Sequence, residues 1–142
     1  SDQVRDFAQV SLSGGTIRTA AGVSETFGNL TVTGSGFLDF GTTSYANANT
    51  ISFGSYNYTP SALLYINNFN FGSTMTFSSN LSGDDLATFS FTNGGIASSS
   101  WNGSTFTITA IPEPSTYLAA AGLLALLLFP AGRRSLRRFI RD

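Results

Sequence analysis

The chain of 142 residues contains no cysteine, no histidine and no lysine. Without cysteine there is no disulfide and no thiolate nucleophile, and without histidine the commonest general base and zinc ligand is missing. The absence of lysine removes the residue that forms Schiff bases with carbonyl substrates. We therefore expect no catalytic residue, no cofactor and no metal, and we interpret the chain as a protein that is not an enzyme.

Charged residues are also scarce, at 11% of the chain, and the formal net charge is −1. Most of the arginines follow residue 130, which leaves Arg5 and Arg18 as the only basic residues before it. The part of the chain before Pro112 is therefore weakly acidic. It lacks the basic face that nucleic-acid binding requires, so we expect no nucleic-acid partner.

Residues 1–110 are rich in Gly, Ser, Thr, Asn and Phe and contain short runs of alternating or β-branched residues, which are typical of strands. Seven such runs are found at 30–33, 37–40, 50–53, 63–66, 75–78, 89–92 and 105–109. Turn signals lie between them, among them Ser82-Gly83-Asp84-Asp85, and no convincing helix is present. Residues 1–22 only hint at a strand or two. The sequence predicts an all-β body.

A Phe-Gly pair recurs at 27/28, 40/41, 53/54 and 71/72. Such a repeat is typical of the coils of a β-solenoid, or of a β-sandwich of short hairpins, because each phenylalanine would end a strand on the core side and each glycine would begin a turn. A separation of 13 residues is short for a full solenoid coil, so both architectures stay open: a β-sandwich or a short β-solenoid-like body.

Three aromatic residues, Trp101, Tyr56 and Tyr58, are candidates for binding a ligand. Flat aromatic faces beside Asn and Ser suit carbohydrates, although such residues more often belong to the core or rim of a small β domain. The sequence leaves both interpretations open.

Carboxylates offer two further hypotheses. Asp84 and Asp85, helped by Asn80 and Asp39, could supply oxygens to Ca²⁺, but the ligand spacing of a dedicated calcium loop is absent, which favours a solvated turn. Catalysis by paired carboxylates would need two of Asp39, Asp84, Asp85 and Glu25 to converge, and their spacing does not indicate this.

The end of the chain, residues 111–142, differs from the body. Pro112, Glu113 and Pro114 form an extended strip that resists helix formation, because each proline fixes its own φ and restricts the preceding residue. Ser115 and Thr116 are suited to capping a helix. An uncharged run of good helix formers follows to Phe129, and we expect an apolar helix over 116–132.

The expected helix is near the lower limit of a membrane span, if the arginines beyond it snorkel to the interface. The residues 133–142 contain five arginines, of which Arg133, Arg134, Arg137 and Arg138 come first. By the positive-inside rule these arginines stay in the cytoplasm and the residues before Pro112 cross the membrane. A plain membrane anchor, or an amphipathic helix on the membrane surface, is the alternative, but neither requires a Pro-Glu-Pro strip beside the apolar run.

These three parts in this order resemble the PEP-CTERM protein-sorting domain of Gram-negative bacteria, with the sorting motif at Pro112, Glu113, Pro114, Ser115 and Thr116. The resemblance covers 111–142 and implies that the chain is a substrate of exosortase, a membrane-embedded transpeptidase-like enzyme that processes the tail. Pro130 and the residues 139–142 depart from the family pattern, which leaves the depth of the helix open.

The body resembles autotransporter-associated β-strand repeat proteins in short stretches such as 28–32, 38–41, 64–69 and 89–95. Together the resemblances imply an exported structural protein of the cell surface or extracellular matrix. It would lie transiently in the inner membrane, its N-terminal side in the periplasm, and then reach the surface. The alternative is a carbohydrate-binding module delivered by the same tail, with extracellular polysaccharide as partner. Since the sequence begins with Ser1 and shows no signal sequence, we expect it to be a fragment of a longer protein.

Overall fold

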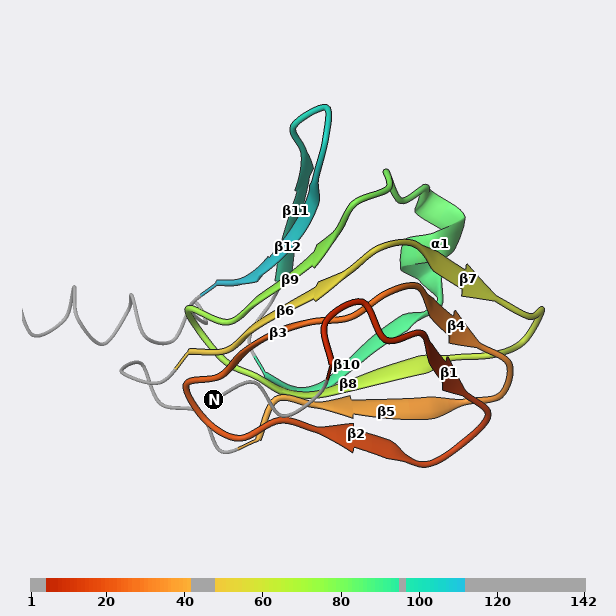
Figure 1. The fold of residues 1–142 in the computed structure, drawn as a ribbon, viewed down its shortest axis with the longest axis horizontal. Coiled ribbons are helices and arrows are strands. Elements are labelled where there is room, and N and C mark those ends of the chain that lie inside the picture. Colours follow the sequence, from red (N-terminus) through yellow and green to blue (C-terminus); the bar gives the residue numbers. More distant parts are fainter. Residues whose placement is uncertain (1–4, 42–47, 95–96, 112–142) are drawn as a thin grey trace, which may run out of the picture. The chain divides into compact units, whose positions relative to one another are not determined.

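Residues 5–41, 48–94 and 97–111 are described in a computed structural model of the chain (Figure 1). The chain divides into two compact units, Ser1–Ile111 and Pro112–Asp142. The sorting motif, the expected apolar helix 116–132 and the arginine-rich end 133–142 all lie outside the described residues. Within the described ranges, no helix has the length and apolar character needed to cross a membrane.

The described part is mostly β and forms three sheets. Sheet A has the order β1-β4-β7, sheet B the order β10-β8-β5-β2, and sheet C the order β11-β12-β9-β6-β3. The bounds of the strands are β1 Val10–Leu12, β2 Thr16–Arg18, β3 Ser24–Thr26, β4 Leu30–Val32, β5 Gly36–Asp39, β6 Thr50–Phe53, β7 Tyr56–Tyr58, β8 Leu64–Phe69, β9 Thr74–Phe77, β10 Phe89–Gly94, β11 Ala97–Trp101 and β12 Phe106–Ala110.

The chain visits the three sheets in rotation, so that β1–β3, β4–β6 and β7–β9 form a first, second and third coil (Figure 1). Each strand pairs in parallel with its counterpart one coil away: Leu30 lies beside Val10 on one side and Tyr56 on the other. Parallel neighbours need a long connection, which the other two strands of each coil supply. This winding is that of the solenoid-like alternative. Among the described strands, antiparallel pairing joins only β12 to β11 and to β9.

The recurring Phe-Gly pairs stand at two kinds of corner. The pairs at 27/28 and 53/54 follow strands of sheet C, and those at 40/41 and 71/72 follow strands of sheet B. Phe27 and Phe53 follow one another at the corner between sheets C and A, and their rings stack at 5.4 Å. Phe40-Gly41 stands at the corner after sheet B, where Gly41 has φ +70° and a Cβ would lie 2.5 Å from the Thr19 carbonyl oxygen. The second coil therefore contains two pairs, and their separation of 13 residues is half of the 26 residues from Leu30 to its counterpart Tyr56.

The core lies between the sheets and is filled by inward-facing aliphatic and aromatic side chains. Its fully buried members include Leu30, Leu38, Phe40, Ile51, Leu64, Ile66, Phe69, Met75 and Phe77. The stack of Phe27 and Phe53 continues to Phe77 at a centroid distance of 5.5 Å. Each buried side chain of this size stabilises the fold by about 1.5–3 kcal/mol, so the aligned rows hold successive coils together.

All seven predicted strands are confirmed, as β4, β5, β6, β8, β9, β10 and β12. The short strands β1, β2, β3, β7 and β11 were not assigned from the sequence. The prediction of a turn at 82–85 is wrong in part, because α1 (Gly83–Ala87) begins there. Ser82 and Asp85 form a capping box: the Ser82 N–H donates to the Asp85 carboxylate at 2.7 Å and the Asp85 N–H donates to Ser82 Oγ at 3.2 Å.

Candidate functional site

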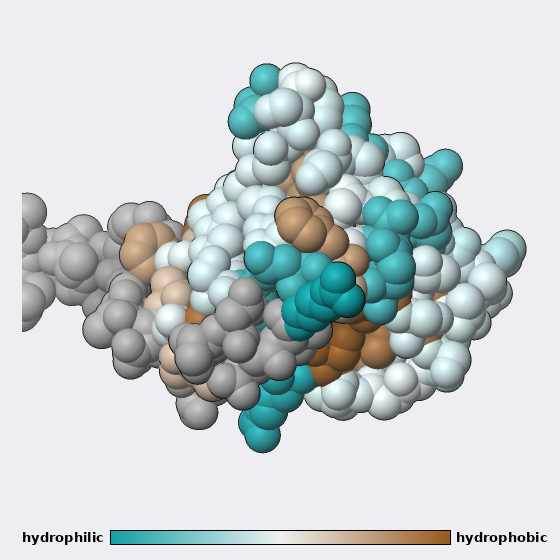
Figure 2. Space-filling view, in the orientation of Figure 1, coloured by the Kyte–Doolittle hydropathy of each residue, from teal (hydrophilic) through white to brown (hydrophobic). Residues whose placement is uncertain are grey.

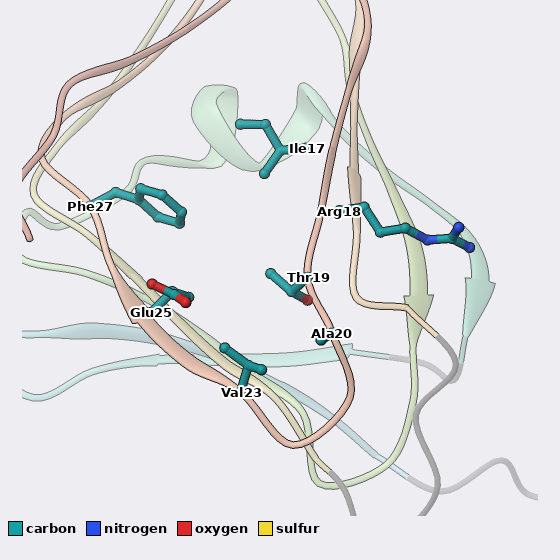
Figure 3. Close-up of a pocket in the computed structure, with 7 residues that line it drawn as sticks. All are labelled: Ile17, Arg18, Thr19, Ala20, Val23, Glu25 and Phe27. Carbon is teal, nitrogen blue, oxygen red and sulfur yellow. The ribbon is translucent and has the colours of Figure 1, made fainter. Parts of the chain in front are cut away.

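A pocket of about 260 Å³ lies in the first coil, formed by β2, β3 and the loop between them (Figure 3). Its lining consists of Ile17, Arg18, Thr19, Ala20, Val23, Glu25 and Phe27. Ile17 and Val23 are half-buried and Phe27 is buried, so the walls are mainly apolar. Glu25 brings a carboxylate into this apolar surrounding. The pocket has the character of a site for a small group that is apolar and carries a hydrogen-bond donor.

Glu25 occupies a position that is apolar in β6, β9 and β12 of the same sheet, while the outermost strand β11 has Ser99 there. It pairs with Ile51, Ile51 with Met75, and Met75 with Ile108. Glu25 is only 5% exposed. An inward-pointing charge on an edge strand disfavours pairing with another chain, and β3 is one of the two edge strands of sheet C. The acid therefore distinguishes the first coil from the others.

Arg18 contributes the apolar stem of its side chain to the pocket, while its guanidinium extends away from it (Figure 3). Arg18 Nε lies 3.0 Å from Asp39 Oδ2. Asp39 also accepts hydrogen bonds from the Gly41 N–H at 2.8 Å and from Asn68 Nδ2 at 2.7 Å. Burial by itself raises the pKa of Asp39, but these hydrogen bonds and the charge of Arg18 outweigh it and hold the pKa below its ordinary value.

Asn49 fixes the loop that forms the rim of the pocket. Its side chain is fully buried and accepts a hydrogen bond from the Val23 N–H at 2.9 Å. It donates to Thr19 Oγ1 at 2.9 Å and to the Phe40 carbonyl oxygen at 2.6 Å. One amide thus ties the first coil to the second. Asn49 of the second coil therefore fixes the positions of Thr19 and Val23, which line the pocket in the first coil.

The carboxylates that the sequence suggested for calcium or for catalysis are distributed over three elements. Glu25 lies in β3, Asp39 in β5, and Asp84 and Asp85 in α1. Asp85 closes the capping box and Asp39 is paired with Arg18. In the part of the chain that the structure describes, no three His, Cys, Asp or Glu residues are grouped so that they could hold a metal ion.

The three aromatic candidates lie on two sheets. Tyr56 and Tyr58 of β7 stack at 5.5 Å, while Trp101 lies in β11 of sheet C. Tyr56 is buried, its hydroxyl lies 2.6 Å from Thr88 Oγ1, and burial raises the pKa of this tyrosine. Trp101 is 39% exposed, opposite Phe106 in the register. The sorting residues Pro112, Glu113, Pro114, Ser115 and Thr116, with Arg133, Arg134, Arg137 and Arg138, lie outside the described residues.

Sequence reasoning missed the role of Asn49 and the special position of Glu25. Both residues could have been found from the sequence if the number of residues in one coil had been known. Asn29 and Ser55, 26 residues apart, lie side by side, and the Ser55 N–H donates to Asn29 Oδ1 at 3.0 Å. Aligning the sequence with itself at this offset places Glu25 beside Ile51 and shows an acid in the first coil where the second coil has an apolar residue.

Comparison of the chain with protein-family models, with curated proteins and with solved structures finds no match.

Proposed function

We propose that the chain is an exported structural protein of the cell surface or extracellular matrix, with a tail that is a sorting signal for an exosortase-type transpeptidase. The observation that carries this proposal is the order of three parts in 111–142: Pro112-Glu113-Pro114, the apolar run, and the arginines. The strip offers an extended backbone to a protease, and the apolar run and the arginines anchor and orient the chain.

The position of the motif relative to the body supports this function. The last strand, β12, ends at Ala110, and the boundary between the two compact units falls between Ile111 and Pro112. Cleavage within residues 112–116 therefore leaves every described strand intact. The released product would keep all the described coils.

The body itself suits a structural role at a surface. Its strands stack in parallel coils around an apolar core, which is the organisation of a short β-solenoid. Its surface is dominated by uncharged polar residues. A body of this kind acts as a stalk or spacer and needs no bound cofactor for that role.

Processing can be tested by replacing both prolines of the motif, Pro112→Ala and Pro114→Ala, in cells that contain the sorting enzyme. Without the prolines, helix can extend through Glu113 and remove the extended strip. We expect surface release to stop while the chain stays in the membrane. Pro60→Ala, a change in an exposed position of the body, is the matched control and should leave release unchanged.

Mass spectrometry of the released form should find a C-terminus at or before Thr116. Released chains that end at Asp142, or unchanged release of the double-alanine variant, would refute the sorting signal and leave a plain membrane anchor.

A further inference from the structure

The outer face of sheet C consists entirely of serine and threonine at the ten positions that the register defines. One row runs across the five strands through Ser24, Thr50, Thr74, Thr109 and Ser98. A second row runs through Thr26, Ser52, Thr76, Thr107 and Ser100. We call these ten residues the hydroxyl face. Successive side chains of a strand point to opposite faces, so these residues point outward and those between them, such as Ile51 and Met75, point into the core.

The hydroxyl face is periodic in two directions. Neighbouring strands lie about 4.7–4.9 Å apart, and alternate residues of one strand are separated by about 6.5–7 Å. Neighbours within a row are in contact: Thr76 Oγ1 donates to Ser52 Oγ at 2.9 Å. The β-branched threonines have restricted χ1 angles, so the hydroxyls and methyls are held in place before any ligand arrives.

The hydroxyl face is uniform within its ten positions, while at its β3 edge the exposed Phe7 lies beside Thr26 and donates its N–H to the Thr26 carbonyl oxygen at 3.3 Å. Its ten positions include no charged and no aromatic residue, and it is bordered by Gly28, Gly54 and Ser78, which are joined by backbone hydrogen bonds of 2.9 Å. On the inner side, the stacked rings of Phe27, Phe53 and Phe77 support the strands. The surface over β6 and β9 in Figure 2 is pale, with little of the strongly hydrophilic or hydrophobic colour seen elsewhere.

Composition alone does not explain the hydroxyl face, because sheet B has a different outer surface. One outward row of sheet B contains Thr16, Phe37, Tyr65 and Ser90, and the next contains Arg18, Asp39 and Asn67. The same chain therefore mixes charged, aromatic and polar residues on one sheet and restricts the outer positions of another to hydroxyls.

We propose that the hydroxyl face binds the surface of ice. An uncharged, regular partner is complementary to an uncharged, regular face, whereas a charged polymer would require opposite charges and a sugar chain would favour an aromatic platform, which this face lacks. Water oxygens at an ice surface donate and accept hydrogen bonds at fixed intervals. The repeat across the strands is close to the oxygen repeat along the a axis of hexagonal ice. Ice binding rests on sheet C and is independent of the proposed sorting signal.

The test is the partition of the full chain, in a non-ionic detergent, between slowly growing ice and the remaining liquid. We expect the chain to be enriched in the ice, while a detergent-solubilised membrane protein of similar size is excluded. Thr74→Tyr and Thr50→Tyr place a bulky ring on the hydroxyl face and should abolish the enrichment. Thr16→Tyr makes the same change on the exposed outer surface of sheet B and should leave the enrichment unchanged.

Circular dichroism must show the same β signal and melting for all variants. Where a tyrosine variant fails to fold, Thr74→Val, which keeps the shape and removes only the hydroxyl, takes its place and should reduce the enrichment. Exclusion of the unmodified chain from ice would overturn the proposal. So would equal enrichment of the sheet B and sheet C variants. Retention on insoluble cellulose that Thr74→Tyr abolishes, without enrichment in ice, would assign the face to a polysaccharide and would likewise overturn it.

Discussion

The first and second coils follow the same path but have different interiors. In the second coil, Leu30, Val32, Leu38, Ile51 and Phe53 are all at most 2% exposed. In the first coil, Val10, Ile17 and Val23 are half-buried, and Ile17, Val23 and Glu25 line a pocket.

The difference shows that burial in this fold comes from stacking. The second coil has a neighbour on each side, whereas in the described residues the first coil pairs with the second coil alone. A coil buries its inner face against its neighbours, so a coil covered on one side tolerates a pocket and an acid that a middle coil would not. Substitutions at matched positions of the two coils should therefore differ in their effect.

Among truncations at matched positions, the largest expected difference is between Phe53→Ala and Phe27→Ala. Phe53 stacks on rings on both sides, at 5.4 and 5.5 Å, whereas Phe27 borders the pocket. Loss of Phe53 should lower the free energy of unfolding by about 3–5 kcal/mol, and loss of Phe27 by less. Urea unfolding followed by circular dichroism measures both. Phe37→Ala, at an exposed position, is the control, and a larger effect at Phe27 than at Phe53 would contradict the comparison.

Removal of the Asn49 side chain, which links the first coil to the second, should have the next largest effect on stability. Asn49→Ala leaves the Val23 N–H and the Phe40 carbonyl without the bonds that the amide provides. A buried group left unsatisfied costs about 1–3 kcal/mol. Hydrogen exchange should show faster opening of β2 and β3, with β6 and β9 protected as before. Uniform loss of protection across all coils would mean that Asn49 is not a local link.

The strands with long alternating runs could be predicted from the sequence. The order in which the chain winds through the three sheets could not. Phe89-Ser-Phe-Thr and Thr105–Thr109 carry enough β-branched and aromatic residues to identify β10 and β12 locally. The three-residue strands β1, β2 and β3 do not, because they are strands only through pairing with the next coil. Parallel pairing between residues far apart in the sequence leaves no pattern within either short strand. The pocket and the hydroxyl face follow from the register and were therefore hidden as well.

A pH-dependent contribution should come from Asp39, which ties β5 to Arg18 of the first coil. Because its pKa in the folded chain is below the ordinary value of 3.8, its contribution to stability is complete above that pH and is lost as the pH falls through the lower, folded pKa. Asp39→Asn should be less stable than the unmodified chain at neutral pH, and the gap should narrow on acidification below pH 3.8. Thermal melts across this range give the gap, and a constant gap would refute the assignment.

The smallest effect is expected at Glu25. Glu25→Leu restores the apolar row of Ile51 and Met75, so the free energy of unfolding should change by less than about 1.5 kcal/mol, whereas Ile51→Glu in the second coil should prevent folding. Urea unfolding of the two variants makes the comparison. A severe loss of stability in Glu25→Leu would show that the carboxylate itself supports the fold.

All of these inferences depend on the register of the coils, which paired cysteines can test in a chain that has none of its own. Thr31 lies between Ser11 and Asn57 in one outward row of sheet A. Adjacent strands place Cα atoms within the range of about 4.4–6.8 Å that a disulfide needs, and strands two apart do not. After mild oxidation, mass spectrometry should find a disulfide in the Thr31→Cys, Asn57→Cys variant and free thiols in the Ser11→Cys, Asn57→Cys variant. Free thiols in the first variant, or a disulfide in the second, would contradict the parallel winding.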